Sequence, residues 1–432
     1  DHFRTMDNPA PLATILLALL ATAAAQAQTP SRDPRWDNIT KALDAFPSHA
    51  CENGTCYMQH FTVMVGNASG RVYEHQVGFL IGPNTPLLMA SASKFPSAMA
   101  IMGPVEDGYV SLDEPVSTHL SFWTTDPSDP RSRVTLRHLL SFTSGFFSAD
   151  AGGDVPCMSD PHHDFVECAQ SIYDKAPFAF EPGSTFDYNS FHLQLAGAVA
   201  SVAANMTINE LLHTYLIQKA GLSDTFYIHK DNPELAASLV ITGNDYEKIL
   251  QKYLTYEMLP KTLADQMETD YTDPKNGVYP SNSTKDLTDF IGHYGFCHWI
   301  ECWNNGNDTI TPACKKQRVH SDPGLFGYYP LIDRRYEYWM QIVYMRLVKN
   351  ITNFGPTEYS SKLRIAVKPA IDDIMSGNST GNWGFENIRE AFGAKTGIPP
   401  RQASGGEALD SRDEAGLREL LDTIARGKGV TS

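Results

Sequence analysis

The chain has 432 residues, enough for one large domain or two ordinary ones with a sizeable core. Hydrophobic residues make up 42% and charged residues 19% of it, which is an ordinary globular composition. The formal net charge of −16 disfavours phosphate backbones and anionic lipid surfaces as partners, so we expect no nucleic-acid role.

The N-terminus has the pattern of a secretory signal peptide, which we place at residues 1–27. The apolar stretch 11–25 is short for a bilayer span, and Ala25-Gln26-Ala27 supplies a small-x-small cleavage pattern. Arg4 is the only positive charge ahead of the stretch, and Met6 is an alternative start. An uncleaved anchor is disfavoured by the polar residues that follow. We therefore expect a secreted, extracellular protein with no stable membrane span after cleavage.

Eight N-x-S/T sequons agree with a eukaryotic secretory pathway, because each is an acceptor for an N-glycan. We expect glycans at Asn67 and at others of the set: Asn38, Asn53, Asn205, Asn282, Asn307, Asn350 and Asn378.

The seven cysteines are grouped locally along the chain: Cys51 with Cys56, Cys157 with Cys168, then Cys297, Cys302 and Cys314. In an oxidising compartment this grouping predicts short-range disulfides and one odd thiol, with the pairing of the last three left open. A metal site needs a second close pair or a histidine pair at fixed spacing, which the chain does not supply. We expect no metal and no cofactor.

The first strand signals come after residue 60. Residues 61–65 and 71–81 predict a hairpin, and the turn between them exposes Asn67. Residues 92–107 predict a helix that Pro104 should kink or end. Two further helices are predicted, a short amphipathic one at residues 135–142 and a strongly apolar one at residues 191–204.

The second half of the chain is less regular. Residues 205–310 have weak periodicity and predict helices and long loops, whereas residues 325–333 and 336–348 predict two strands. An amphipathic helix is expected at residues 360–375. A polar, loosely attached C-terminal extension follows at residues 377–432, with a helix near residues 412–426.

This order favours an α+β fold, an α/β sandwich in which helices flank an antiparallel sheet. We expect one domain at residues 28–376, with a mostly helical insertion at about residues 110–310.

Ser91-Ala92-Ser93-Lys94 is the only S-x-x-K in the chain. On a helix, positions i and i+3 share a face, so the hydroxyl of Ser91 and the amine of Lys94 can touch. A serine hydroxyl needs a neighbour to take its proton, and a lysine serves if its surroundings favour the neutral amine. The motif follows the apolar run 87–90, which places Ser91 at a strand-to-helix junction.

Three further segments share an order and spacing with a known family: GYVSLDEPV (108–116), RVTLRHLLSFTSGF (133–146) and EPGSTFDYNSFHLQLAG (181–197). With the S-x-x-K, the chain resembles the serine β-lactamase and penicillin-binding-protein superfamily, in its class C, D-peptidase and esterase-like branch. The resemblance covers roughly residues 55–375. It implies that Ser91 is a nucleophile and that Lys94 belongs to the same site.

Tyr188 matches the second motif of the family, in which a tyrosine acts as general base and acid. A phenol of ordinary pKa, about 10, needs nearby cations to ionise at neutral pH, and Lys94 is the candidate. The family usually has asparagine two residues later, where this chain has Ser190, with Asn189 in the middle position. A serine can hydrogen-bond Lys94 but lacks the paired donor and acceptor of an amide, which disfavours β-lactam or peptide recognition.

The third motif of the family is K-T-G or H-x-G on an edge strand beside the nucleophile. A literal Lys395-Thr396-Gly397 lies in the Gly/Pro-rich tail without a strand after it. The better candidate is His320, in His320-Ser321-Asp322, although an ordinary loop histidine is about as good an interpretation. Asp322 replaces glycine there, and Pro323 lacks the backbone N–H that the family uses as a second oxyanion donor, unless Gly324 or Leu325 supplies one.

The resemblance therefore implies a serine hydrolase that forms an acyl-enzyme on Ser91, with Lys94, Tyr188, Ser190 and His320 as candidate site residues. An ester or small amide is the expected substrate. Two alternatives remain: a non-catalytic binding or assembly protein of the same fold, and a D-peptidase or β-lactamase.

Overall fold

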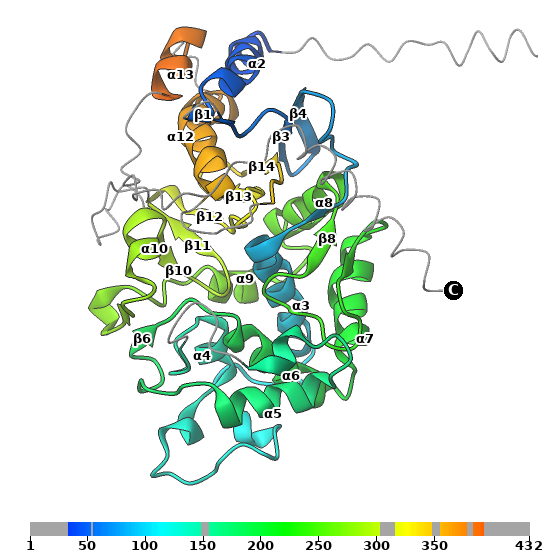
Figure 1. Cartoon of the computed structure of the whole chain (residues 1–432), viewed down its shortest axis with the longest axis vertical. Coiled ribbons are helices and arrows are strands. Elements are labelled where there is room, and N and C mark those ends of the chain that lie inside the picture. The colour runs from blue at the N-terminus through cyan, green and yellow to red at the C-terminus, as the bar shows by residue number, and fades with distance from the viewer. Residues whose placement is uncertain are drawn as a thin grey trace, which may run out of the picture.

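The computed structural model describes residues 33–52, 55–147, 155–302, 316–347, 355–377 and 383–392. The predicted signal peptide, the Lys395-Thr396-Gly397 sequence and the tail helix near residues 412–426 lie outside these residues. The described residues form an α+β structure, as predicted, with a seven-stranded antiparallel sheet at one end and a mostly helical body at the other (Figure 1).

The seven strands come from both ends of the folded region: β3 (Phe61–Asn67), β4 (Gly70–Val77), β10 (Gly292–Tyr294), β11 (Trp299–Glu301), β12 (Val319–Ser321), β13 (Tyr329–Asp333) and β14 (Tyr338–Val343). Their order in the sheet is β10-β11-β12-β13-β14-β3-β4, and each neighbouring pair is antiparallel. The predicted hairpin at residues 61–81 is confirmed as β3 and β4. The predicted strand pair at residues 325–348 is confirmed as β13 and β14.

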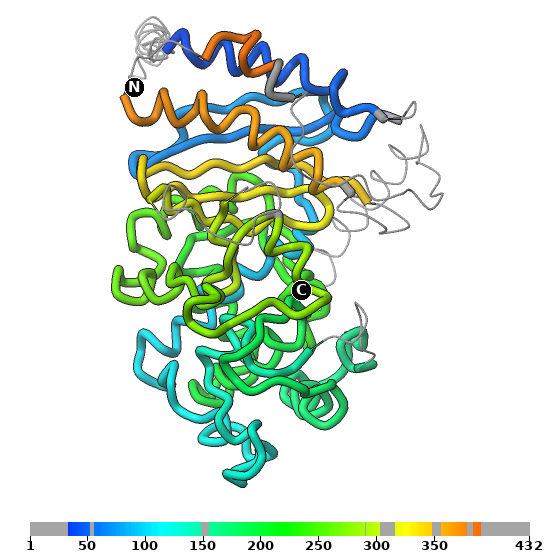
Figure 2. The backbone as a smooth tube through the Cα atoms, turned by 90° about the vertical axis from the view of Figure 1, so that its left-hand side faces the viewer, coloured from blue at the N-terminus to red at the C-terminus, as the bar shows by residue number. Residues whose placement is uncertain are grey.

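Helices cover both faces of the sheet. On one face lie α2 (Arg35–Ala45) and α12 (Gly355–Met375), and α13 (Phe385–Phe392) packs against both of these helices. Figure 2 shows these three helices stacked beyond the strands. On the other face, α8 (Gly243–Leu254) packs against β3, β13 and β14. Ile388 of α13 is fully buried, so part of the expected C-terminal extension belongs to the folded body.

The helical body contains the remaining described α-helices: α3 (Lys94–Glu106), α4 (Leu136–Leu140), α5 (Phe165–Lys175), α6 (Phe191–Ala204), α7 (Ile208–Leu212), α9 (Lys261–Met267) and α10 (Lys285–Phe290). Apolar α6 is the predicted helix at residues 191–204, and it packs against α3, α4, α5 and α7. Pro104 does not end α3 at once, because the helix runs on to Glu106.

Three small sheets complete the fold. The pairs are β1 (Cys51–Glu52) with β2 (Thr55–Cys56), and β6 (Thr185–Phe186) with β9 (Tyr279–Pro280); a triple joins β5 (Leu87–Leu88), β8 (Leu239–Ile241) and β7 (Phe226–Tyr227). The triple matters for function because β5 leads directly into the Ser91 turn.

Two disulfides confirm the predicted short-range pairing, Cys51 with Cys56 and Cys157 with Cys168. Cys302 is also disulfide-bonded. Cys297 is a free, buried thiol. These bonds are consistent with an oxidising compartment.

Within the described residues, no single helix is long and apolar enough to cross a membrane. Phe191–Ala204 and Ile208–Gln218 pass the length and composition test only as a pair, which is bent by 91°.

Candidate active site

Ser91 lies in a single 3-10 turn, Ala90–Ser93, that joins strand β5 to helix α3. Strand β8 fixes the start of this turn, because the Met89 N–H donates to the Leu239 carbonyl at 2.9 Å. Ala90 has a φ of +47°, a left-handed conformation that costs a non-glycine residue about 1 kcal/mol. The predicted strand-to-helix position of Ser91 is therefore confirmed, and local strain is stored one residue before it.

Lys94 reaches back to Ser91 across one turn. Its Nζ lies 3.0 Å from Ser91 Oγ and donates a second hydrogen bond of 3.0 Å to the Ala236 carbonyl. The lysine is 3% exposed, so its amine is shielded from bulk water while Ser91 stays partly exposed. The i,i+3 contact expected from the S-x-x-K spacing is present.

Tyr188 approaches the same pair from the segment between β6 and α6. Its backbone N–H donates to Thr284 Oγ1 at 2.8 Å, and its ring stacks on Trp299 with centroids 5.4 Å apart. The ring centre lies 4.7 Å from Lys94 Nζ, and the phenol is near enough to Ser91 and Lys94 for both side chains to influence its pKa. The structure thus brings Ser91, Lys94 and Tyr188 together.

Burial dominates the ionisation of Tyr188. It raises the pKa of the phenol above its ordinary value, although the charge of Lys94 and the hydrogen bonds to Ser91 and Lys94 act in the lowering direction. The resting side chain is therefore a neutral phenol, and proximity to Lys94 does not make it a standing phenolate.

Ser190 faces a different partner from the one the sequence suggested. Its hydroxyl donates to Glu234 Oε1 at 3.0 Å, and the Ala236 carbonyl takes the place beside Lys94 that we had expected Ser190 to share. Asn189 is buried and turned inward, where its amide donates to Asp187 Oδ1 at 2.7 Å. Asn189 therefore does not take over the role of the motif asparagine that is missing at position 190.

His320 lies on β12, and its ring is turned into a buried polar cluster. Its Nδ1 lies 3.0 Å from His298 Nε2, and its Nε2 lies 3.4 Å from Glu268 Oε2. Glu268 is paired at 2.7 Å with Arg334. Among the described residues, no hydrogen bond joins His320 to Ser91, Lys94 or Tyr188.

Burial sets the charge of this cluster. It lowers the pKa of His320 to about 3, so the ring is neutral at neutral pH. Burial acts to raise the pKa of Glu268, but His320 and the Arg334 guanidinium act in the lowering direction and hold it at about 2; since His320 itself is neutral at neutral pH, Arg334 is the standing cation of the pair. The cluster is an ionised Glu268–Arg334 pair with two neutral imidazoles, an arrangement that serves packing and registry.

Asp322 fills the place where the family pattern has glycine. Its Oδ2 accepts the Phe95 N–H at 2.9 Å and so caps the N-terminal end of α3, while Oδ1 is buried without a hydrogen-bond partner among the described residues. Burial raises the pKa of this carboxyl well above its ordinary range, and Lys94 acts in the opposite direction. The high pKa favours the neutral form of the Asp322 carboxyl.

Asp322, Pro323 and Gly324 supply no spare backbone donor, whereas the Leu325 N–H makes no hydrogen bond among the described residues and stays a candidate. Pro323 has no N–H, the Asp322 N–H bonds to the Pro330 carbonyl at 3.3 Å, and the Gly324 N–H bonds to the Tyr328 carbonyl at 2.8 Å. A Cβ on Gly324 would lie 2.2 Å from the Met89 carbonyl, so this loop passes tightly against the Ser91 turn. The strand that precedes it, β12, is the third of seven rather than an edge strand.

Sequence reasoning missed several groups that complete the site. Glu234 and the Ala236 carbonyl belong to a turn before β8, and Trp299 belongs to β11. All three come from residues 205–310, where weak periodicity gave no motif. Only the arrangement in space identifies them.

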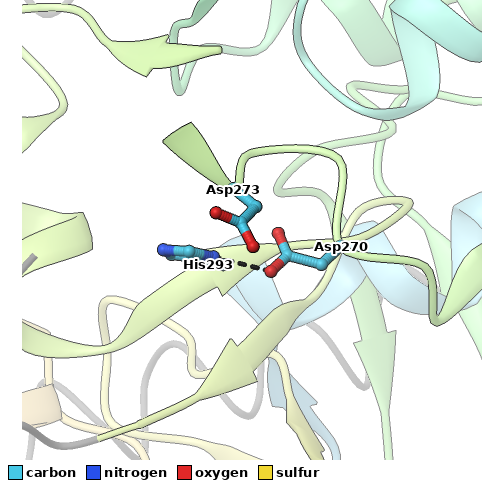
Figure 3. Close-up of side chains that lie close together, drawn as sticks. All are labelled: Asp270, Asp273 and His293. Carbon is cyan, nitrogen blue, oxygen red and sulfur yellow. Dashed lines mark hydrogen bonds and ion pairs between the residues drawn. The ribbon is translucent and has the colours of Figure 1, made fainter. Parts of the chain in front are cut away.

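One group of described side chains has donor atoms close enough for a metal ion: Asp270, Asp273 and His293, within 4.8 Å of one another (Figure 3). The structure assigns these atoms other partners. His293 Nδ1 lies 2.7 Å from Asp270 Oδ2, and Asp273 accepts the Lys275 N–H at 3.0 Å. No independent feature points to an ion there.

Comparison with known proteins shows similarity to proteins of the β-lactamase fold. The family model described as Beta-lactamase matches residues 57–267, a range that contains Ser91, Lys94 and Tyr188 but not His320. A structure from Bacteroides dorei DSM 17855, named as a β-lactamase candidate, superposes with a TM-score of 0.60 at 21% identity, covering 80% of this chain and 99% of that one. These matches support a place for the chain in the serine β-lactamase and penicillin-binding-protein-like superfamily.

Two curated relatives match more locally. The lovastatin esterase of Penicillium rubens is 27% identical over 171 residues, which cover 36% of this chain and 42% of the relative. Esterase EstB of Burkholderia gladioli is 27% identical over 190 residues, which cover 41% and 47%. The chain thus spans less than half the length of these two relatives.

Proposed function

We propose that the protein is an esterase or small-amide hydrolase that works through an acyl-enzyme on Ser91. The single observation that carries this proposal is the 3.0 Å approach of Lys94 Nζ to Ser91 Oγ, with the Tyr188 ring centre 4.7 Å from the same Nζ. A serine, a buried amine and a phenol in contact form a nucleophile with a proton relay.

In the proposed cycle, Ser91 Oγ attacks the substrate carbonyl and its proton passes to Lys94 Nζ, which acts as the general base. The tetrahedral intermediate collapses as the Tyr188 phenol protonates the leaving alcohol or amine and recovers a proton from Lys94. Water then attacks the acyl-enzyme by the reverse relay, giving the acid and free Ser91. The Ser91 N–H, at the positive end of α3, is the proposed oxyanion donor.

The ester preference rests on two points. Ser190 cannot offer the paired amide contacts that an asparagine gives a β-lactam or peptide, and its hydroxyl is engaged by Glu234. Two of the matching relatives are named as esterases. A D-peptidase or β-lactamase would instead turn over nitrocefin or form a stable penicillin adduct.

The direct test is labelling by a fluorophosphonate probe, read by intact-mass spectrometry. We expect one adduct per chain on the wild type and none on Ser91→Ala. Ser93→Ala is the matched control, because Ser93 lies in the same motif but is fully buried and binds the Leu239 N–H. Equal labelling of wild type and Ser91→Ala would refute the assignment.

A non-catalytic role is the second candidate, favoured by the lack of a spare N–H at Asp322–Gly324. It predicts no probe adduct on Ser91 and no turnover across a panel of esters, amides and β-lactams, in a protein that is folded by circular dichroism.

We also propose that the protein is secreted and glycosylated. Asn67 is half-buried at the tip of the β3–β4 hairpin and Asn205 is exposed at the end of α6, so both acceptors are accessible. Expression in eukaryotic cells should give a protein in the medium whose N-terminus follows Ala27. An intracellular, unglycosylated product would contradict this proposal.

A further inference from the structure

Glu234 lies beside the Ser91 site and has no role in the proposed chemistry. It belongs to the turn before β8, which the site residues hold in place. The Ala236 carbonyl accepts from Lys94 Nζ at 3.0 Å, and the Leu235 carbonyl accepts from Ser97 Oγ at 2.8 Å. The backbone of this turn is therefore fixed directly against α3.

The side chain of Glu234 is tied to the second motif as well. Its Oε1 accepts the hydroxyl of Ser190, two residues after Tyr188, at 3.0 Å. The carboxylate is partly exposed, and among the described residues no lysine, arginine or histidine pairs with it. A carboxylate that is held by one hydroxyl and has no cation of its own can accept one from a ligand.

The rest of the site offers little to an anionic ligand. His320 is neutral and engaged by His298 and Glu268, and Asp322 stands where the family has glycine. Among the described residues, Lys94 is the only lysine or arginine in contact with Ser91, Tyr188 or Ser190. Because Lys94 is engaged by Ser91 and the Ala236 carbonyl, the partly exposed carboxylate of Glu234 is the charge that is left to bind a group of the ligand, and it favours a cation.

We propose that Glu234, positioned by Ser190, determines specificity by binding a cationic group of the substrate, so that the Ser91 site prefers esters bearing an ammonium group and disfavours anionic ones. This inference rests on the proposed function and names the substrate class for it. Glu234 contacts the substrate, whereas Ser190 acts through Glu234.

The test compares three 4-nitrophenyl esters of similar acyl length: 4-(trimethylammonio)butanoate, its uncharged isostere 5,5-dimethylhexanoate, and the glutarate half-ester. We expect kcat/KM for the ammonium ester to exceed that of the isostere by about tenfold, which is about 1.4 kcal/mol, and the glutarate to be the slowest. The preference should appear mainly in KM. A second comparison, of kcat/KM for acetylthiocholine and for S-(3,3-dimethylbutyl) thioacetate, tests whether the preference also holds for a cationic leaving group.

Glu234→Gln should bring the ratio of kcat/KM between the ammonium ester and the uncharged isostere down to about one, since the charge contact is removed. Ser190→Ala should reduce the preference in part. Asp231→Asn is the matched control, because it removes a carboxylate from an exposed position three residues away, and it should keep the full preference. In the wild type, 0.5 M NaCl should weaken the preference, a readout that needs no variant.

Failure of this inference is distinguishable from failure of the proposed function. If the uncharged ester is hydrolysed with Ser91 but no ammonium preference is found, only the role of Glu234 is overturned. If nothing is hydrolysed, the role of Glu234 can still be tested by binding. Calorimetry would measure the binding of methyl 4-(trimethylammonio)butanoate to Ser91→Ala and to the double variant that also carries Glu234→Gln. Binding that is equal with and without the substitution overturns it.

Discussion

The segment around Ser91 and the segment around His320 belong to one site in the family pattern, yet they differ here. Lys94 is hydrogen-bonded to Ser91 and lies 4.7 Å from the centre of the Tyr188 ring, and all three residues lie within the range that the family model matches. His320 lies beyond that range and turns into a neutral, buried cluster with His298 and Glu268. Under the proposed function, this difference means that the residues for attack and proton transfer follow the family pattern, while those for substrate recognition depart from it.

The contrast between the two segments would not hold if Lys94 were dispensable for activity. The loss of activity on replacement of Lys94 is the largest effect that we expect. Lys94→Met keeps the length and apolar contacts of the side chain but removes the proton acceptor, so probe labelling and kcat/KM should fall by about 10³-fold. Folding should not suffer, because an apolar side chain replaces a buried amine.

Lys219→Met is the control for this change, since Lys219 pairs with Glu106 near the surface, and it should leave the activity as it is. Retention of activity within tenfold in Lys94→Met would mean that another group takes the proton of Ser91.

Tyr188→Phe should have the next largest effect. It keeps the ring stacked on Trp299 but removes the hydroxyl that is proposed to protonate the leaving group, so kcat should fall by about 10²-fold with little change in KM. Tyr294→Phe is the matched control, because it removes a buried hydroxyl without a hydrogen-bond partner from the same aromatic cluster. Similar losses in both variants would indicate damage to packing rather than loss of a proton relay.

Local sequence patterns were enough to predict the elements and contacts that depend on residues close together in the chain. Alternation predicted the β3–β4 hairpin, the apolar run predicted α6, and the i,i+3 spacing predicted the contact between Ser91 and Lys94. The partners of Lys94 and Ser190 could not be predicted, because Ala236 and Glu234 come from an irregular region that reaches the site only through tertiary packing. The direction of the His320 ring is likewise set by its contact with Glu268, which lies 52 residues earlier in the chain.

The smallest predicted effect concerns His320 and separates a structural role from a catalytic one. His320→Gln replaces a neutral, buried ring with a neutral amide, so we expect kcat/KM for the uncharged ester to change less than about threefold at pH 7.5. Its clearer signature should be in stability. The pKa of His320 is about 3 in the folded protein and about 6.5 when unfolded, so the unfolded chain binds the extra proton as the pH falls.

The unfolding free energy of the wild type should therefore fall as the pH is lowered from 6.5 to 4.5. This range lies above the pH at which Glu268 takes up its proton in the folded protein. His320 should account for up to about 2 kcal/mol of the loss. Denaturant titrations at these two pH values should show a flatter dependence in His320→Gln, with a remaining slope from His298 and His192, whose pKa values burial lowers to about 4. His162→Gln, at an exposed ring, should keep the wild-type slope. A large loss of kcat at unchanged stability would place His320 in the chemistry, and the two segments would then differ less than their geometry indicates.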